Sequence, residues 1–314
     1  MSYAPKQKLL RAIPLIFYSV LIVFLYLYLS RIDFSQFRQA EFVWGYILLA
    51  SLLGLSTRLW QSLVWLVILN SLGANGLYAE RRQLIYIYAK SWLGRYIPGT
   101  APWLIGKIYF ASRHGISKSK LAISSLLEGG LQIAVVMAMS LIMLFSDRRL
   151  DVVNIRFKIL ILALLICCLI AIIPSVFNRI ASLVYRIIKK HTLPSEHLAS
   201  SQTVIRGSVL YAIGAVFSGL SLFFIAKAIY PELSYSNMLF VMGAGNLAGA
   251  VSMLAVFAPS GIGVREGIQL TILSVIMPTE LALLVTITTR LWGVVMDLIF
   301  FSLSKIIANS APER

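Results

Sequence analysis

Long apolar runs separated by short polar stretches occupy most of the chain. A helix that crosses a bilayer needs about 20 consecutive, predominantly apolar residues. Runs of that kind predict about six full spans, at 12–30, 42–69, 117–143, 157–173, 207–230 and 279–307. The pattern therefore predicts an all-α fold, that of a polytopic helical membrane protein with a single membrane domain over residues 1–314.

Two further apolar stretches, 83–110 and 236–277, contain residues that interrupt a helix. These residues are Pro98 and Gly99 in the first stretch, and Pro259, Gly261 and Gly263 in the second. Proline removes a backbone N–H and clashes with the preceding turn, so it breaks a helix. Irregular backbone at membrane depth is tolerated only where protein encloses it or where it lines a wet cavity. Both stretches are therefore predicted to be broken helices that border a cavity.

Basic residues lie between the apolar runs, and 28 Lys and Arg against 12 Asp and Glu give a net charge of +16. Together with 59% hydrophobic residues, this placement excludes a soluble nucleic-acid-binding module. Cytoplasmic loops of membrane proteins are rich in Lys and Arg. The chain is therefore predicted to be a multi-pass protein of the cell (cytoplasmic) membrane, the inner membrane, with both termini cytoplasmic. The stretch 83–110 is basic at both ends, which predicts a re-entrant hairpin from the cytoplasmic side.

The basic stretch 175–206 is predicted to be a cytoplasmic linker that contains a helix lying on the membrane surface. It separates two predicted repeat units, a first unit at 42–146 and a second, inverted unit at 207–307. In each unit a proline and a glycine precede a second glycine, which a cation follows within two residues, and the next span holds one ionisable residue. The matching positions are Lys107 with Arg265, and Glu128 with Arg290.

Inverted repeats with discontinuous helices near the middle of the membrane are typical of transporters. Under this interpretation the stretch 236–277 is a second re-entrant hairpin, which enters the membrane from outside. The alternative is that residues 236–257 cross the membrane fully and that the likeness between the two units is chance.

Charged residues inside spans are costly, so each needs a partner or a wet cavity. Arg265 and Glu266 follow Gly263, where a half-helix should begin, and the free N–H groups of a helix N-terminus suit a phosphate. We therefore expect Arg265 to contact an anionic substrate; the alternative is an internal ion pair with Glu266 or Glu128. The candidate substrate-binding residues are Arg58, Arg95, Pro98, Gly99, Lys107, Glu128, Gly261, Gly263, Arg265, Glu266 and Arg290.

Other polar residues in the spans are expected to hold helices together. Arg290 and Asp297 are seven residues apart and share one helix face, so a buried structural pair between them is one expectation. Asn246 lies between Gly245 and Gly249, in a pattern of small residues that favours close helix packing. We expect the Asn246 side chain to form a hydrogen bond across that contact.

No familiar signature of an enzyme is present in the sequence. It has no Gly-rich Walker loop, no cluster with metal-ligand spacing and no Ser-His-Asp set. Cys167 and Cys168 are adjacent in an apolar run, so they are expected to pack rather than to bind metal or form a disulfide. We predict no catalytic residue, no metal site and no cofactor; whether the protein is an enzyme stays open, and a transporter is favoured.

The ten residues 258–267, APSGIGVREG, resemble the P-x-G-x-G-x-R-E motif of the lysylphosphatidylglycerol synthase transmembrane-region family. In the first half, the residues similar to that family's hairpin and its Ser…Glu pattern are Arg95-Tyr96-Ile97-Pro98-Gly99, Gly106-Lys107, Ser117 and Glu128. The likeness covers roughly residues 10–307 and departs at Thr100-Ala101-Pro102, where members often keep a Gly-rich stretch.

The resemblance implies a flippase-type domain, which in bifunctional members moves an aminoacylated phospholipid that a separate soluble domain makes. The chain ends soon after the last predicted span, so we expect a stand-alone member that lacks the synthase domain. The predicted function is translocation of an anionic lipid, a phospholipid or a polyprenyl-phosphate-linked lipid, through a polar groove between two re-entrant hairpins.

Two other functions remain open at this stage. One is a membrane-embedded transferase that acts on a lipid-phosphate substrate, and the other is a non-transporting subunit of a lipid or glycan synthesis complex. The predicted partners are an anionic membrane lipid or lipid-linked substrate, with lipid or glycan biosynthesis enzymes as further candidates and no nucleic acid.

Overall fold

The structure is a computed structural model, and it describes residues 42–74, 77, 80–96, 101–147, 149, 154–190, 198–255, 261 and 263–310. In these ranges the chain forms helices and no strands, as the sequence predicts. The predicted first span at 12–30 lies outside the described residues. The same holds for Pro98, Gly99 and Pro259 at the predicted breaks.

Four long helices confirm predicted spans. They are α2 (Trp44–Ser71), α5 (Lys118–Phe145), α8 (Ser201–Ile229) and α11 (Thr279–Asn309). Each is long and apolar enough to cross a bilayer, and so is the segment Tyr235–Leu254. The described part of the chain therefore holds 5 candidate spans, or up to 6 if the bent pair α6 and α7 counts as one. The chain is a multi-pass helical membrane protein.

The helix α6 (Ile155–Ile172) covers the predicted span at 157–173 and is followed by α7 (Pro174–Lys189). The two helices meet at an angle of 87°. Pro174 stands in the first turn of α7, where a missing N–H costs no helical hydrogen bond. The sharp bend gives α7 the perpendicular course that a helix on a membrane surface needs.

The helix α7 is attached to the bundle near its beginning. Phe177 is buried and lies against Gly130 of α5. The Asn178 side chain accepts a hydrogen bond from the Ala199 N–H at 3.0 Å and donates one to its carbonyl at 2.8 Å. Further along α7, four apolar side chains on one face are exposed: Ile180, Leu183, Val184 and Ile187. An amphipathic helix thus forms inside the predicted basic linker.

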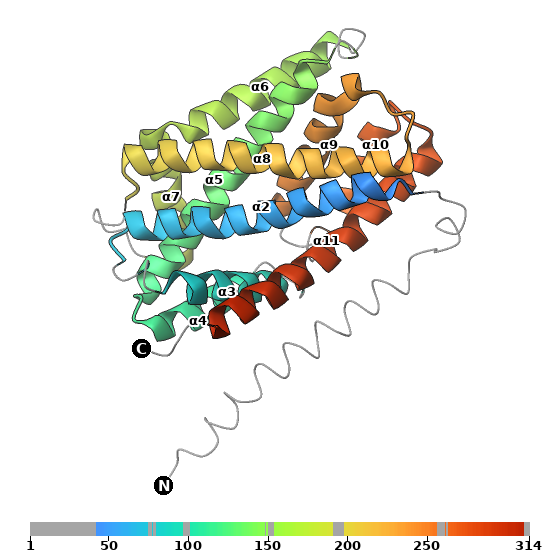
Figure 1. Cartoon of the computed structure of the whole chain (residues 1–314). Coiled ribbons are helices and arrows are strands. Elements are labelled where there is room, and N and C mark those ends of the chain that lie inside the picture. Colours follow the sequence, from blue (N-terminus) through green and yellow to red (C-terminus); the bar gives the residue numbers. More distant parts are fainter. Residues whose placement is uncertain are drawn as a thin grey trace.

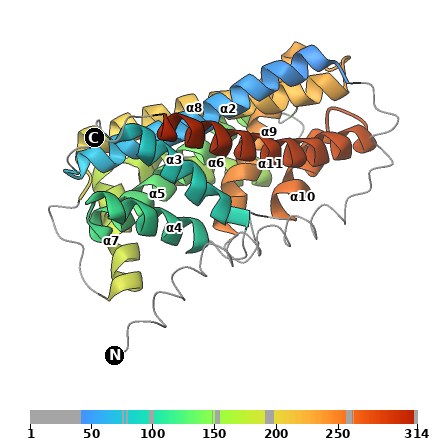
Figure 2. The same ribbon diagram turned by 60° about the horizontal axis from the view of Figure 1, so that its bottom comes forward.

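Each predicted broken stretch contains two helices with a break between them. The first stretch consists of α3 (Arg81–Trp92), the 3₁₀ turn η2 (Leu93–Tyr96) and α4 (Ala101–Ala111), followed by η3 (Ser112–His114). The second consists of η6 (Tyr235–Asn237), α9 (Met238–Leu254) and α10 (Val264–Leu273). The arms of each stretch contact each other, α3 with α4 and α9 with α10 (Figure 2). The re-entrant course of the two stretches remains a prediction, because the segment Tyr235–Leu254 is long and apolar enough to cross a bilayer alone.

Two glycines let the arms of the broken stretches approach closely. A Cβ atom at Gly94 would lie 2.9 Å from the backbone nitrogen of Trp103, so a larger residue would push α4 away. Gly261 has a φ of +67°, and a Cβ atom there would lie 2.3 Å from the Ser252 Cβ. Only glycine adopts that φ without strain and leaves room for α9.

Helices from the two predicted units interleave in the bundle. The helix α2 runs beside α8, and α5 packs against α9 (Figure 1). As predicted, Asn246 of α9 donates a hydrogen bond to the Ala215 carbonyl of α8, at 3.0 Å. Gly245 also lies against α8, since a Cβ atom on Gly245 would lie only 2.3 Å from Leu222 Cδ2. A Cβ atom on Gly249 would have no neighbouring atom within 4 Å. One end of the small-residue pattern therefore packs, and the other end faces open space.

Candidate functional site

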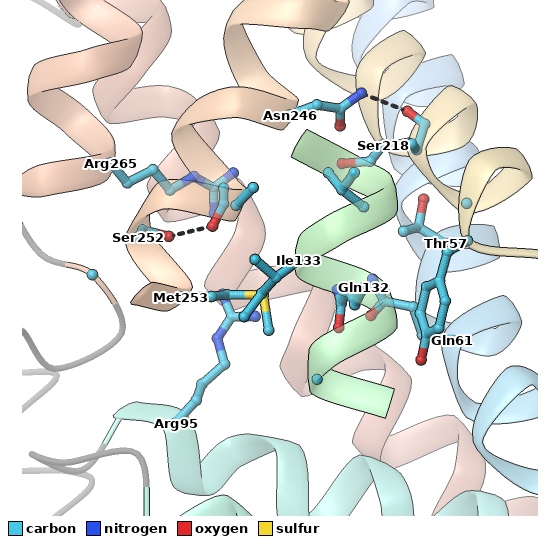
Figure 3. Close-up of a pocket in the computed structure, with 18 of the residues that line it drawn as sticks. Thr57, Gln61, Arg95, Gln132, Ile133, Ser218, Asn246, Ser252, Met253 and Arg265 are labelled. Atoms are coloured by element: carbon cyan, nitrogen blue, oxygen red, sulfur yellow. Dashed lines mark hydrogen bonds between the residues drawn. The ribbon is translucent and has the colours of Figure 1, made fainter. Parts of the chain in front are cut away.

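A cavity of about 740 Å³ lies inside the bundle, among α2, α5, α7, α8, α11 and both broken stretches. The first broken stretch contributes Trp92, Arg95 and Trp103 to its wall. The second contributes Ser252 and Arg265, among others (Figure 3). Residues beside both predicted breaks therefore border one cavity, as the sequence analysis expected.

The charged side chains on the cavity wall are all cationic in the described part of the chain. They are Arg58 from α2, Arg95 from η2 and Arg265 from α10. No Asp or Glu among the described residues lines the cavity. The wall therefore carries an excess of positive charge, which favours an anion inside the cavity.

One buried carboxylate behind the wall holds two of these arginines. Asp297 of α11 is 1% exposed and accepts hydrogen bonds from Arg58 Nε at 2.5 Å and from the Tyr96 hydroxyl at 2.6 Å. The Arg95 Nε lies 3.7 Å from the second carboxylate oxygen, Oδ2. Two guanidinium groups thus share a single negative charge, and a net positive charge remains at this side of the cavity.

The two arginines differ in how many donors remain for a ligand. Arg58 also donates hydrogen bonds to the backbone carbonyls of Gly54 at 2.9 Å and Gly293 at 2.8 Å. The protein therefore already uses all three nitrogen atoms of its guanidinium group. The Arg95 guanidinium instead lies over the Trp92 ring, 4.8 Å from its centroid. Arg95 is therefore oriented by a ring and a carboxylate while it keeps donors for an anion.

Arg265 lies in the first turn of α10 and points toward the cavity (Figure 3). Gly263 before it has a φ of +84°, and its N–H donates a hydrogen bond of 2.8 Å to Glu266 Oε2, which caps the helix. Arg265 forms no hydrogen bond and no ion pair with any other described residue. The alternative pairings of Arg265 with Glu266 or Glu128 are therefore not found.

Glu266 and Arg290 belong to a different contact. The Arg290 Nε lies 3.4 Å from Glu266 Oε1, and Arg290 is only 4% exposed. The expected pair between Arg290 and Asp297 was wrong. Seven residues along a helix correspond to a rise of about 10 Å, which separates the two side chains even though they share a face. Asp297 binds Arg58 and Tyr96 of neighbouring elements instead.

Lys107 and Glu128 form a closed cluster that does not line the cavity. They are each 1% exposed and form a salt bridge, and the Tyr88 hydroxyl donates to Glu128 Oε1 at 2.9 Å. Three aromatic rings surround the Lys107 ammonium, with centroids 4.5 Å away for Trp103, 4.7 Å for Tyr88 and 5.1 Å for Trp65. The structure thus pairs these two sequence candidates with each other.

The sequence analysis missed several neutral polar groups on the cavity wall. Gln61 of α2 and Gln132 of α5 are partly buried and form no hydrogen bond with another described residue. Tyr211 of α8 also borders the cavity, and its buried hydroxyl forms no hydrogen bond with another described residue. A Gln inside a predicted span would have been the available signal, because an amide in a membrane core needs partners.

These features make the cavity suited to an anionic, partly polar ligand. A guanidinium group donates two parallel hydrogen bonds to a phosphate and stays charged when it is partly buried. Apolar residues of α7 and α8 complete the wall beside the cations and amides. The described residues contain no group of three or more His, Cys, Asp or Glu side chains arranged to hold a metal ion.

Comparison with known proteins identifies the family of the chain. No curated protein and no solved structure matches the chain. A family model described as the lysylphosphatidylglycerol synthase TM region matches residues 12–300, which include the spans, both broken stretches and every residue of the cavity wall. The chain therefore belongs to the lysylphosphatidylglycerol synthase transmembrane-region family.

Proposed function

We propose that the protein is a lipid translocase, which moves an anionic phospholipid or polyprenyl-phosphate-linked lipid between the leaflets of the cytoplasmic membrane. The observation that carries the proposal is Arg265, which reaches the cavity without a hydrogen-bond or ion-pair partner among the described residues. Arg95 and Arg58 lie on the same wall, and family membership supports a role that involves membrane lipids.

The cations reduce the main obstacle to lipid exchange. A charged headgroup that leaves water for the hydrocarbon core loses its hydration, which costs many kcal/mol if nothing replaces it. Arg265 and Arg95 come from different broken stretches and offer fixed donors to a phosphate inside the cavity. The phosphate then exchanges water for guanidinium hydrogen bonds, and the barrier to crossing falls.

The tails of the lipid need a different path from its headgroup. Three α7 residues line the cavity, Ile180, Ala181 and Val184, whereas Leu183 and Ile187 on the same helix are exposed and do not line it. An apolar wall that continues onto the outer surface lets acyl or prenyl chains stay in the bilayer while the headgroup is inside. We propose that α7 lies at the cytoplasmic surface, with both termini of the chain on that side.

A transferase that acts on a lipid phosphate would need an acid or base beside the phosphate. The two carboxylates among the predicted substrate-binding residues, Glu128 and Glu266, are not among the described residues that line the cavity. Both are engaged elsewhere, Glu128 by Lys107 and Glu266 by the Gly263 N–H. Translocation needs only the cationic residues that line the cavity, whereas group transfer would also need an acid or base that the described wall lacks.

Leaflet exchange in proteoliposomes tests the proposal. The full chain is reconstituted with a fluorescent phosphatidylglycerol, and a membrane-impermeant quencher reports how fast the inner-leaflet lipid reaches the outer leaflet. We expect fast exchange, and Arg265→Ala should slow it by at least about tenfold, because a charge-assisted hydrogen bond contributes about 1.5–3 kcal/mol. Arg206→Ala is the matched control, since Arg206 is an exposed arginine on α8 outside the cavity wall.

Two results would contradict the proposal. One is a wild-type protein that exchanges no anionic phospholipid and no polyprenyl-phosphate lipid faster than protein-free vesicles do. The other is an Arg265→Ala variant that exchanges lipid as fast as the Arg206→Ala control does.

A further inference from the structure

We infer that the headgroup carried through the cavity is a phosphate that bears an uncharged, hydroxyl-rich group, such as a sugar or another polyol. A headgroup with an ammonium group, whether zwitterionic or aminoacylated, is disfavoured by the charges of the wall. The inference rests on the proposed function and names the class of lipid that the same cavity takes. Two properties of the wall support it: its charges and its neutral polar side chains.

The charges of the wall oppose a cationic group. Arg58, Arg95 and Arg265 line the cavity, and the described residues add no carboxylate to it. By sequence, the breaks at 97–100 and 256–260 contain no Asp or Glu either. An ammonium group in the cavity would therefore meet three cations and no carboxylate among the described residues of the wall, so only the phosphate of such a lipid would be favoured.

The neutral polar groups match hydroxyls. A glutamine amide offers two donors and an acceptor. Gln61 and Gln132 line the cavity and form no hydrogen bond with another described residue. Their amides are therefore available to the hydroxyl groups of a ligand.

Two of the cations are separated from the two amides. In Figure 3, Arg95 and Arg265 lie on one side of Ile133, while Gln61 and Gln132 lie on the other. A ligand that contacts both sides needs an anionic end and a neutral, hydrogen-bonding end. The cavity of about 740 Å³ falls within the range that encloses small-molecule ligands, which leaves room for a phosphate and a sugar-sized group.

Binding of four lipids to the purified full chain in detergent micelles tests the inference. The probes are phosphatidylinositol, phosphatidic acid, phosphatidylethanolamine and lysylphosphatidylglycerol. We expect phosphatidylinositol to bind at least about tenfold more tightly than the two lipids with ammonium groups, and several-fold more tightly than phosphatidic acid. The double variant Gln61→Leu/Gln132→Leu should lose the preference over phosphatidic acid, and Arg265→Ala should weaken binding of both anionic lipids.

A second variant keeps the test decisive if the double variant fails to fold. Gln132→Glu adds a carboxylate to the wall, so it should weaken phosphatidylinositol binding and strengthen lysylphosphatidylglycerol binding. Equal affinity of the wild type for phosphatidylinositol and either ammonium lipid would overturn the inference, and so would an unchanged lipid preference in Gln132→Glu. If none of the four lipids binds, phosphatidic acid included, the proposed function is overturned as well. Failure of the inference alone and failure of the proposed function therefore give different results.

Discussion

Lys107 and Arg265 occupy matching positions in the two predicted repeat units, and their surroundings are opposite. Lys107 is 1% exposed, bonded to Glu128 and enclosed by aromatic rings. Arg265 lines the cavity and has no hydrogen-bond or ion-pair partner among the residues that the structure describes. The first half thus pairs the cation beside its break with an acid, whereas the second half leaves its cation exposed to the cavity.

The residue at the next matching position accounts for the difference. In the first half α5 carries Glu128, which reaches Lys107. In the second half α11 carries Arg290, a cation, which contacts Glu266 and leaves Arg265 without that acid. A single exchange of charge sign therefore accompanies a closed ion pair in one predicted unit and, in the other, a cation without an ion-pair partner among the described residues. Three predictions test this contrast.

The largest expected effect is on stability, in the closed half. Glu128→Gln leaves the Lys107 ammonium buried without its counter-charge, which costs about 3–5 kcal/mol when one partner of a buried pair is removed. Unfolding of the purified protein in mixed micelles measures the change in free energy. The double variant Lys107→Met/Glu128→Leu removes both charges and should retain much more stability. If Glu128→Gln were as stable as Arg206→Ala, the Lys107–Glu128 pair would not be what stabilises this half of the molecule.

An intermediate effect is expected at Asp297, which holds Arg58 and Arg95 from behind the cavity wall. Asp297→Asn removes the counter-charge of Arg58 and Arg95, whose side chains are 15% and 21% exposed at the cavity. Water in the cavity can hydrate the two guanidinium groups, so the loss should be about 1.5–3 kcal/mol, the range for a lost hydrogen bond to a charged group. The same unfolding assay measures it. A loss equal to that of Glu128→Gln would mean that the cavity does not hydrate its arginines.

Much of this arrangement followed from the sequence, and its limits have a physical cause. Run length predicted α2, α5, α8 and α11, because a span must match the bilayer thickness. Pro and Gly residues marked both broken stretches, and the cost of a charge in a membrane marked Arg265 and Lys107 as candidates. These properties are local, so a single sequence carries them.

The pairing of the charges could not be predicted in the same way. Arg58 and Asp297 are separated by 239 positions, and only the packing of α2 against α11 brings them together. The expected Arg290–Asp297 pair relied on a shared helix face and ignored the rise between the residues. Gln61 and Gln132 were missed because the search of the spans considered charged residues, and a glutamine side chain is neutral. Its unpaired donors nevertheless matter inside a cavity.

The smallest expected effect on stability is at the residue that should matter most for transport. Arg265→Ala removes no hydrogen bond or ion pair between described residues, so its free energy of unfolding should stay within about 0.5 kcal/mol of the wild type. Its lipid exchange should nevertheless fall by the factor expected above. A binding site keeps unsatisfied groups for its ligand, so function and stability separate there, whereas Glu128→Gln should lose stability first. If Arg265→Ala lowered stability as much as Glu128→Gln does, Arg265 would be a structural cation like Lys107, and the asymmetry between the two halves would not exist.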